Sequence, residues 1–257
     1  MADPAPSDFT DPAFLAAREA AMRAVPAPPD APPWRPPSFA DALRVSEKIT
    51  SDYRELHRPD SMDVKPSEVC AALQQGGVKN WVLMGLHGYV GYMSDPRATQ
   101  DVDVLVPYSQ KKKAVKAILD RWPTLVVGEM EFVVRFKDPG DLDEKGQPKV
   151  VIDLMLPWGA LHEAIIKNCV STDERTQLRI PTVEAALACK YAAMISPHRL
   201  RKKKLLDTAD FTNIVEAGEK PFDEPTLRRL GDLVWEKGGE ELVRFVEIAL
   251  NDGQFPL

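Results

Sequence analysis

One stretch, residues 81–107, constrains the fold of this chain more than any other; it reads WVLMGLHGYVGYMSDPRATQDVDVLVP. Its apolar start, 81–84, is typical of a short strand, and the turn at 85–88 contains two glycines. A proline-marked turn then leads to a segment in which Asp101 and Asp103 alternate with apolar residues. Because alternate residues of a strand point to the same side, this segment predicts a strand with both carboxylates on one face.

Two carboxylates on one face repel each other and are costly to remove from water. A divalent cation between them removes that cost, and oxygen ligands of this kind suit Mg²⁺. A third acid, Asp153, interrupts the run 149–156, which otherwise reads as a fully buried strand, so this acid needs a metal, a cation or backbone donors as its partner. Two alternatives stay open: Asp101 and Asp103 could form an exposed pair at a strand edge, and Asp153 could accept an N–H group or a buried arginine.

Composition places the chain among ordinary globular proteins, because 44% of its 257 residues are hydrophobic and 28% are charged. The net charge of −6 argues against nucleic-acid binding through bulk charge, so such a contact would need a local basic patch. The three cysteines form no C-x-x-C pair, which argues against a disulfide framework or structural zinc and for a reducing compartment. No apolar run approaches the roughly 20 residues of a membrane span, and the N-terminus lacks the apolar core of a signal peptide. We therefore expect a cytoplasmic protein with no membrane contact.

The sequence predicts three regions. Residues 1–37 contain 10 of the 23 prolines, interleaved with alanine, and predict a flexible tail that serves as a docking arm or has no ordered role. A short helix is expected within this tail, over about 12–23. Residues 38–157 predict an α/β (α+β) domain, a mixed β-sheet with flanking helices, and residues 158–257 predict a helical C-terminal region.

Periodicity and capping residues give the individual elements. We expect helices over 38–57, 66–75, 109–122, 183–195, 199–215, 225–236 and 240–250, and strands over 81–84, 101–106, 125–127, 131–137 and 149–156. Residues 138–148 predict a polar, turn-rich loop, and its glycine and proline content argues against a calcium site there.

The turn Gly85-x-x-Gly88 and the following segment RATQDVDV, residues 97–104, resemble the signature of the polymerase-beta-type nucleotidyltransferase superfamily. In particular they are similar to the R-x-T-x-D-x-D string of the AbiEii-type toxins and their relatives. The later residues Lys190 and Arg199, followed by Asp207-x-x-Asp210, resemble that group's helical lysine, arginine and D-x-x-D pair. The resemblance covers about residues 79–215, and it departs from many members in the turn, where they carry adjacent glycines or Gly-Ser.

This resemblance implies a magnesium site of two ions. Asp101 and Asp103 would ligate Mg²⁺, and Asp153 would ligate the second ion and help to deprotonate an acceptor hydroxyl. The turn from Gly85 to Gly88 would hold the triphosphate of an NTP.

The resemblance also implies contacts outside the metal site. Nucleotide binding would involve Arg97, Thr99 and Lys190, while Asp207 and Asp210 would orient Lys190 or the acceptor. Several simpler interpretations stay open: Arg97 and Thr99 could only fix the loop before the strand, Lys190 could be a surface lysine, and the two later acids could pair with Lys203 and Lys204. The basic residues 199–204 could hold RNA phosphates or form a solvated helix start, and His87 reads as a turn residue and not a ligand.

The first hypothesis for function is a Mg²⁺-dependent nucleotidyltransferase that moves a nucleoside monophosphate from an NTP to a hydroxyl and releases pyrophosphate. By resemblance, the acceptor would be a tRNA end or a protein hydroxyl, and the chain could be the toxin of a toxin-antitoxin pair with a cognate antitoxin. Two alternatives are an antibiotic-type transferase that acts on a small molecule and a non-catalytic nucleotide-binding or interaction module of the same fold.

Overall fold

The computed structural model describes residues 38–94, 97–218 and 221–256. The predicted tail 1–37 and its short helix lie outside the described residues. The described residues form one compact unit, so the described parts of the predicted regions 38–157 and 158–257 lie within the same unit. Among the described residues, none of the helices combines the length and the apolar character that a membrane span requires.

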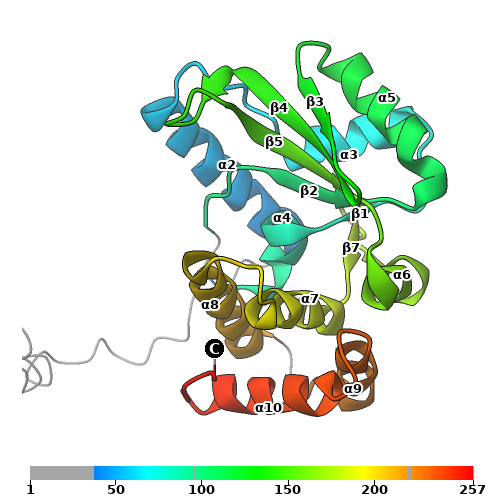
Figure 1. Cartoon of the computed structure of the whole chain (residues 1–257), viewed down its shortest axis with the longest axis vertical. Coiled ribbons are helices and arrows are strands. Elements are labelled where there is room, and N and C mark those ends of the chain that lie inside the picture. The colour runs from blue at the N-terminus through cyan, green and yellow to red at the C-terminus, as the bar shows by residue number, and fades with distance from the viewer. Residues whose placement is uncertain (1–37, 95–96, 219–220, 257) are drawn as a thin grey trace, which may run out of the picture. The chain divides into compact units, whose positions relative to one another are not determined.

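A five-stranded mixed sheet organises the N-terminal part of this unit (Figure 1). Its strands lie in the order β1 (Val82–Leu83), β2 (Val102–Leu105), β5 (Pro148–Met155), β4 (Val133–Leu142) and β3 (Val126–Glu129). The central pair, β2 and β5, is parallel, and every other pair is antiparallel. The predicted fold class, a mixed α/β sheet with flanking helices, is confirmed.

One face of this sheet is apolar and fully buried. Its side chains come from alternate positions of the three central strands: Val102, Val104, Ile152, Leu154, Val134 and Phe136. Helices α3 (Pro66–Gln75) and α5 (Lys111–Arg121) pack beside each other on one side of the sheet (Figure 1). Because side chains alternate along a strand, burying the valines of β2 directs Asp103 to the opposite face.

Helix α2 (Phe39–His57) packs against the strand–turn–helix unit that the sequence predicts. It begins at Ser38, whose hydroxyl accepts the backbone N–H of Asp41, as the capping pattern predicts. It packs against the short helix η1 (Val90–Tyr92), which follows α4 (Gly85–Tyr89). A one-turn helix, η2 (Tyr108–Gln110), leads into α5.

The C-terminal part is mainly helical, as predicted, but it also contains a hairpin that the sequence pattern does not predict. After α6 (Gly159–Asn168) come the paired strands β6 (Val170–Thr172) and β7 (Arg179–Pro181), and then α7 (Val183–Ile195), α8 (Arg201–Ala217), α9 (Glu224–Asp232) and α10 (Gly238–Leu250). Helix α7 contacts α4 on one side and α8, α9 and α10 on others. It therefore connects the sheet region to the C-terminal helices, which explains why so many of its alanines are buried.

The prediction of a loop over 138–148 is wrong for its first half, because β4 continues to Leu142. Two acids in this segment are buried and have partners. Asp138 accepts the backbone N–H groups of Met62 and Gly140, and Asp141 forms ion pairs with Arg58 and Lys149. Met62 and Arg58 lie far from the segment in the sequence, and Lys149 lies on the paired strand, so the sequence pattern alone does not indicate that these acids are buried.

Candidate metal centre and its surroundings

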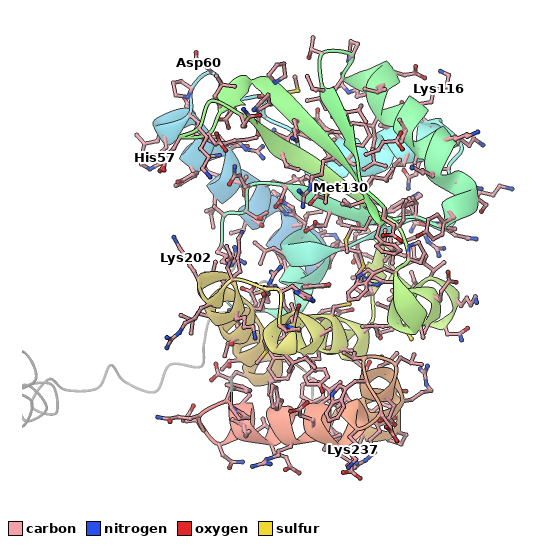
Figure 2. All side chains as sticks on the ribbon, viewed as in Figure 1. His57, Asp60, Lys116, Met130, Lys202 and Lys237 are labelled. Carbon is pink, nitrogen blue, oxygen red and sulfur yellow. The ribbon has the colours of Figure 1, made fainter. Side chains whose placement is uncertain are left out.

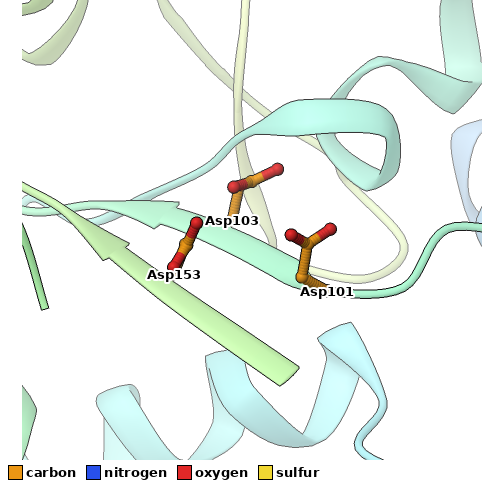
Figure 3. A group of neighbouring side chains, drawn as sticks. All are labelled: Asp101, Asp103 and Asp153. Atoms are coloured by element: carbon orange, nitrogen blue, oxygen red, sulfur yellow. The ribbon is translucent and has the colours of Figure 1, made fainter. Parts of the chain in front are cut away.

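The three predicted acids Asp101, Asp103 and Asp153 meet at one point of the sheet. The parallel register of β2 and β5 places Asp103 directly opposite Asp153, and Asp101 lies just before β2. Each acid offers one carboxylate oxygen, and these oxygens lie within 4.8 Å of one another. Figure 3 shows the three side chains on the same side of the two strands. A mutual spacing of this size allows one cation to contact all three groups.

The electrostatics of this cluster favour a bound cation. No lysine or arginine among the described residues forms an ion pair with Asp101 or Asp103, although the hydroxyl of Thr99 donates to Asp101 at 3.3 Å. Burial and the nearby charges of Asp101 and Asp153 raise the pKa of Asp103 well above its usual value. Burial and Asp101 also raise the pKa of Asp153 to about 6, although Arg135 opposes this rise. Ionised carboxylates are therefore costly here until a positive charge joins them.

The oxygen chemistry of the cluster fits a hard divalent cation, a class that includes Mg²⁺, Mn²⁺ and Ca²⁺. The ligand atoms are all hard carboxylate oxygens, and neither histidine nor cysteine belongs to the group. Oxygen Oδ1 of Asp153 is buried and has no hydrogen-bond partner among the described residues, so a ligand to this atom would remove an unsatisfied buried acceptor.

Gly85 lies against the cluster, and only glycine fits there. Its φ angle is +60°, and a Cβ atom at this position would lie 2.0 Å from Oδ2 of Asp103. The neighbouring N–H of Met84 donates to the carbonyl of Asp103 at 2.8 Å, which ties the turn to β2. Gly88 has a different reason to be small, because its Cβ would lie 2.3 Å from the carbonyl oxygen of Leu83. Gly88 thus allows α4 to pack on β1, whereas Gly85 leaves room for the Asp103 carboxylate.

We predict that Gly85→Ala weakens Mg²⁺ binding by at least about tenfold, because the added methyl group must displace the Asp103 carboxylate; supporting groups around a metal typically contribute this much. The matched control is Gly146→Ala, which introduces the same strain at a φ of +72° but meets no atom within 4 Å. Isothermal titration with Mg²⁺ measures both variants. Equal affinities in the two would contradict this role for Gly85.

A second charged cluster joins α7 and α8 to the loop before β2. The buried ammonium of Lys190 donates to Asp210 at 2.6 Å and to Asp207 at 3.1 Å. Arg97 forms two parallel hydrogen bonds to Asp210, of 2.8 and 3.0 Å, and Arg199 forms an ion pair with Asp207. Lys190 is therefore not a surface lysine, and its two acids hold it in place instead of pairing with Lys203 and Lys204.

This second cluster carries three cations and two acids, and its positive charge acts on the metal centre. Burial would raise the pKa of Asp210, but hydrogen bonds from Arg97 and Lys190 lower it below its usual value, so this acid stays ionised. Lys190 and Arg199 also oppose the rise in the pKa of Asp103. The centre thus has three acids that can hold a cation and, nearby, a cluster of net positive charge that suits anionic phosphate.

Helix α2 fixes the segment that carries Arg97 and leads to Asp101. Three buried polar residues spaced by four lie on one face of this helix. Ser46 donates to the carbonyl of Arg97, Thr50 accepts the N–H of Thr99, and Arg54 donates to the carbonyl of Gln100 at 2.8 Å. Sequence reasoning missed these residues, although polar side chains at this spacing on a core-facing helix are a usable signal.

His87 is buried in α4, with Nδ1 3.4 Å from the hydroxyl of Ser46. Burial and the nearby charges of Arg54 and Arg97 lower its pKa to about 3, so the ring is neutral near pH 7. It does not belong to the candidate metal-binding group among the described residues.

Arg201, Lys202 and Lys203 at the start of α8 are exposed and Lys204 is half-buried, and none of the four forms an ion pair with another described residue; Arg199, just before the helix, is the one that pairs with Asp207. Figure 2 shows Lys202 projecting outward from this end of the helix. The next leucines, Leu205 and Leu206, are exposed as well. The start of α8 is thus a solvated surface of positive charge, within a chain of net charge −6.

No protein-family model matches the sequence, and no curated protein matches it. Among solved structures, the chain is similar to an antigenic nucleotidyltransferase-like protein from Paracoccidioides brasiliensis, with a TM-score of 0.37 and 13% identity over 82% of this chain and 94% of that chain. A similarity this low does not establish a family, and the resemblance to the AbiEii-type toxins stays a prediction.

Proposed function

We propose that this chain is a Mg²⁺-dependent nucleotidyltransferase that moves a nucleoside monophosphate from an NTP to a hydroxyl group and releases pyrophosphate. The observation that carries the proposal is the meeting of Asp101, Asp103 and Asp153 beside a cluster of net positive charge. An NTP with its metal carries a positive ion, which complements the three acids, and negative phosphates, which complement the positive cluster. Paired acids that hold divalent metal are the usual basis of this kind of phosphoryl chemistry.

The residues of the chain have separate tasks in this proposal. Asp101, Asp103 and Asp153 would hold Mg²⁺, which supplies charge neutralisation at the phosphates and activation of the attacking oxygen. Lys190 and Arg97, fixed by Asp210, would attract and orient the triphosphate.

Asp153 and Gly85 have further roles in this proposal. Asp153, whose buried Oδ1 makes no hydrogen bond with the described residues, would help to deprotonate the acceptor hydroxyl. Gly85 has no side chain that would displace the Asp103 carboxylate from the metal.

The exposed basic start of α8 favours a polyanionic acceptor, and a tRNA end is the acceptor we propose first. In keeping with the AbiEii-like string, we propose that the chain acts as the toxin of a toxin-antitoxin pair. Transfer to a protein hydroxyl or a small molecule, and binding without transfer, are the competing outcomes.

The test is transfer of label from each of the four α-labelled NTPs, with Mg²⁺, into total RNA, protein and small-molecule fractions. We expect label in the RNA fraction from the wild-type chain and none from Asp103→Asn. Label in another fraction that is also lost in the variant would replace the proposed acceptor. NTP binding without label in any fraction would favour the non-catalytic module, and label that survives in the variant would exclude this site.

A further inference from the structure

Arg135 on β4 lies beside the candidate metal centre. The antiparallel register of β4 and β5 places it directly opposite Asp153, so the two side chains project from the same face of the sheet. Its Nε lies 3.5 Å from Oδ1 of Asp153, and its side chain is 41% exposed. It is therefore the cation nearest to the metal ligands among the described residues.

This ion pair differs from the one between Arg97 and Asp210. Arg97 binds Asp210 through two short hydrogen bonds of 2.8 and 3.0 Å. Arg135 and Asp153 approach each other without forming a hydrogen bond, and both facing atoms, Nε and Oδ1, are buried without a partner. The Arg97–Asp210 pair is fixed by charge-assisted hydrogen bonds. The Arg135–Asp153 pair neutralises charge but leaves the Asp153 oxygen open to a better ligand.

We propose, resting on the function proposed above, that Arg135 is a positioning residue that neutralises Asp153 in the metal-free protein and opposes metal binding until the nucleotide arrives. A guanidinium close to Oδ1 repels a second cation at the same oxygen. An incoming triphosphate offers the guanidinium a stronger partner, because arginine binds phosphate through paired N–H groups. Arg135 then leaves Asp153 free to bind metal.

The test uses Mn²⁺ as the probe, titrated into the full chain without nucleotide and followed by electron paramagnetic resonance. We expect Arg135→Gln to bind Mn²⁺ about tenfold more tightly than the wild type, because the competing charge is gone. Arg135→Lys keeps the charge and should restore an affinity close to that of the wild type. The matched control is Lys137→Gln, which removes one positive charge two residues along the same strand; no ion pair joins Lys137 to Asp153.

A double-mutant cycle separates a contact effect from a general charge effect. In an Asp153→Asn background, Arg135→Gln should change Mn²⁺ affinity no more than Lys137→Gln does. The inference is overturned if Arg135→Gln and Lys137→Gln behave alike, or if the effect of Arg135→Gln persists without Asp153. If the wild type binds Mn²⁺, Asp103→Asn does not, and Arg135→Gln changes nothing, the metal centre stands and this inference fails. If neither the wild type nor Arg135→Gln binds Mn²⁺, both fail.

Discussion

The Asp103→Asn variant is expected to unfold at a higher temperature than the wild-type protein when no divalent metal is present. In the wild type, burial and two neighbouring acids make ionisation of Asp103 costly, which is why its pKa is raised. Asparagine has nearly the same shape and carries no charge, so the cost disappears. We expect Tm to rise by about 3 °C or more, since each 1 kcal/mol shifts Tm by roughly 2–4 °C in a domain of this size.

Saturating Mg²⁺ should reverse this order. The wild type gains stability from binding, whereas Asp103→Asn has lost a ligand and should gain little. The control is Asp120→Asn, which removes a mostly exposed acid on α5 and should behave like the wild type with and without metal. Thermal unfolding of the three proteins in EDTA and in Mg²⁺ measures both effects. A lower Tm for metal-free Asp103→Asn than for the metal-free wild type would contradict the idea that the ionised Asp103 destabilises the fold.

The free energy of unfolding of the metal-free wild type should depend on pH, and the raised pKa of Asp153 sets the direction of that dependence. Asp153 has a pKa of about 6 in the folded chain and near 4 when unfolded. The folded state therefore binds more protons between these values, and the free energy of unfolding falls as pH rises through this window. The difference between these two pKa values corresponds to roughly 3 kcal/mol. Mg²⁺ needs the ionised form, so its affinity should weaken as pH falls below about 6.

Lys190→Met should have the second large effect, and it should act on both stability and substrate binding. The ammonium lies between Asp207 and Asp210, which are both buried. Removing one partner of a buried ion pair costs roughly 3–5 kcal/mol. We expect a loss near the lower limit, because Arg199 and Arg97 still neutralise the two acids.

Urea unfolding of Lys190→Met measures the stability loss, and a binding titration with NTP and Mg²⁺ measures the predicted loss of affinity. Lys203→Met is the control, because it removes a lysine from the exposed start of α8. It should leave stability and NTP affinity unchanged. An Lys190→Met variant as stable as the control would contradict the structural role of this lysine.

Much of the candidate site could be predicted because its signals are local. The alternation around Asp101 and Asp103 fixes a shared face, since burying the valines on one side directs both acids to the other. Asp153 stands out because a single charge interrupts an apolar strand. The spacing of Asp207 and Asp210, three apart on a helix, indicates one common face, and both acids meet Lys190 there.

The parts that could not be predicted depend on which strands and helices become neighbours. The position of Arg135 opposite Asp153 follows from the register of β4 and β5, which no local pattern encodes. The same holds for Asp138, whose partner Met62 comes from a distant loop. The support that α2 gives to the loop before Asp101 requires knowing that this helix faces that loop.

The most direct test of the central claim is the position of the metal itself. Crystals of the full chain grown with Mn²⁺ and a non-hydrolysable NTP analogue would give an anomalous difference map at the manganese edge. We expect a peak within bonding distance of carboxylate oxygens of Asp101, Asp103 and Asp153, with the analogue's phosphates between that peak and Lys190. Bound analogue with no peak at these acids, or with the metal held elsewhere, would contradict the proposed centre.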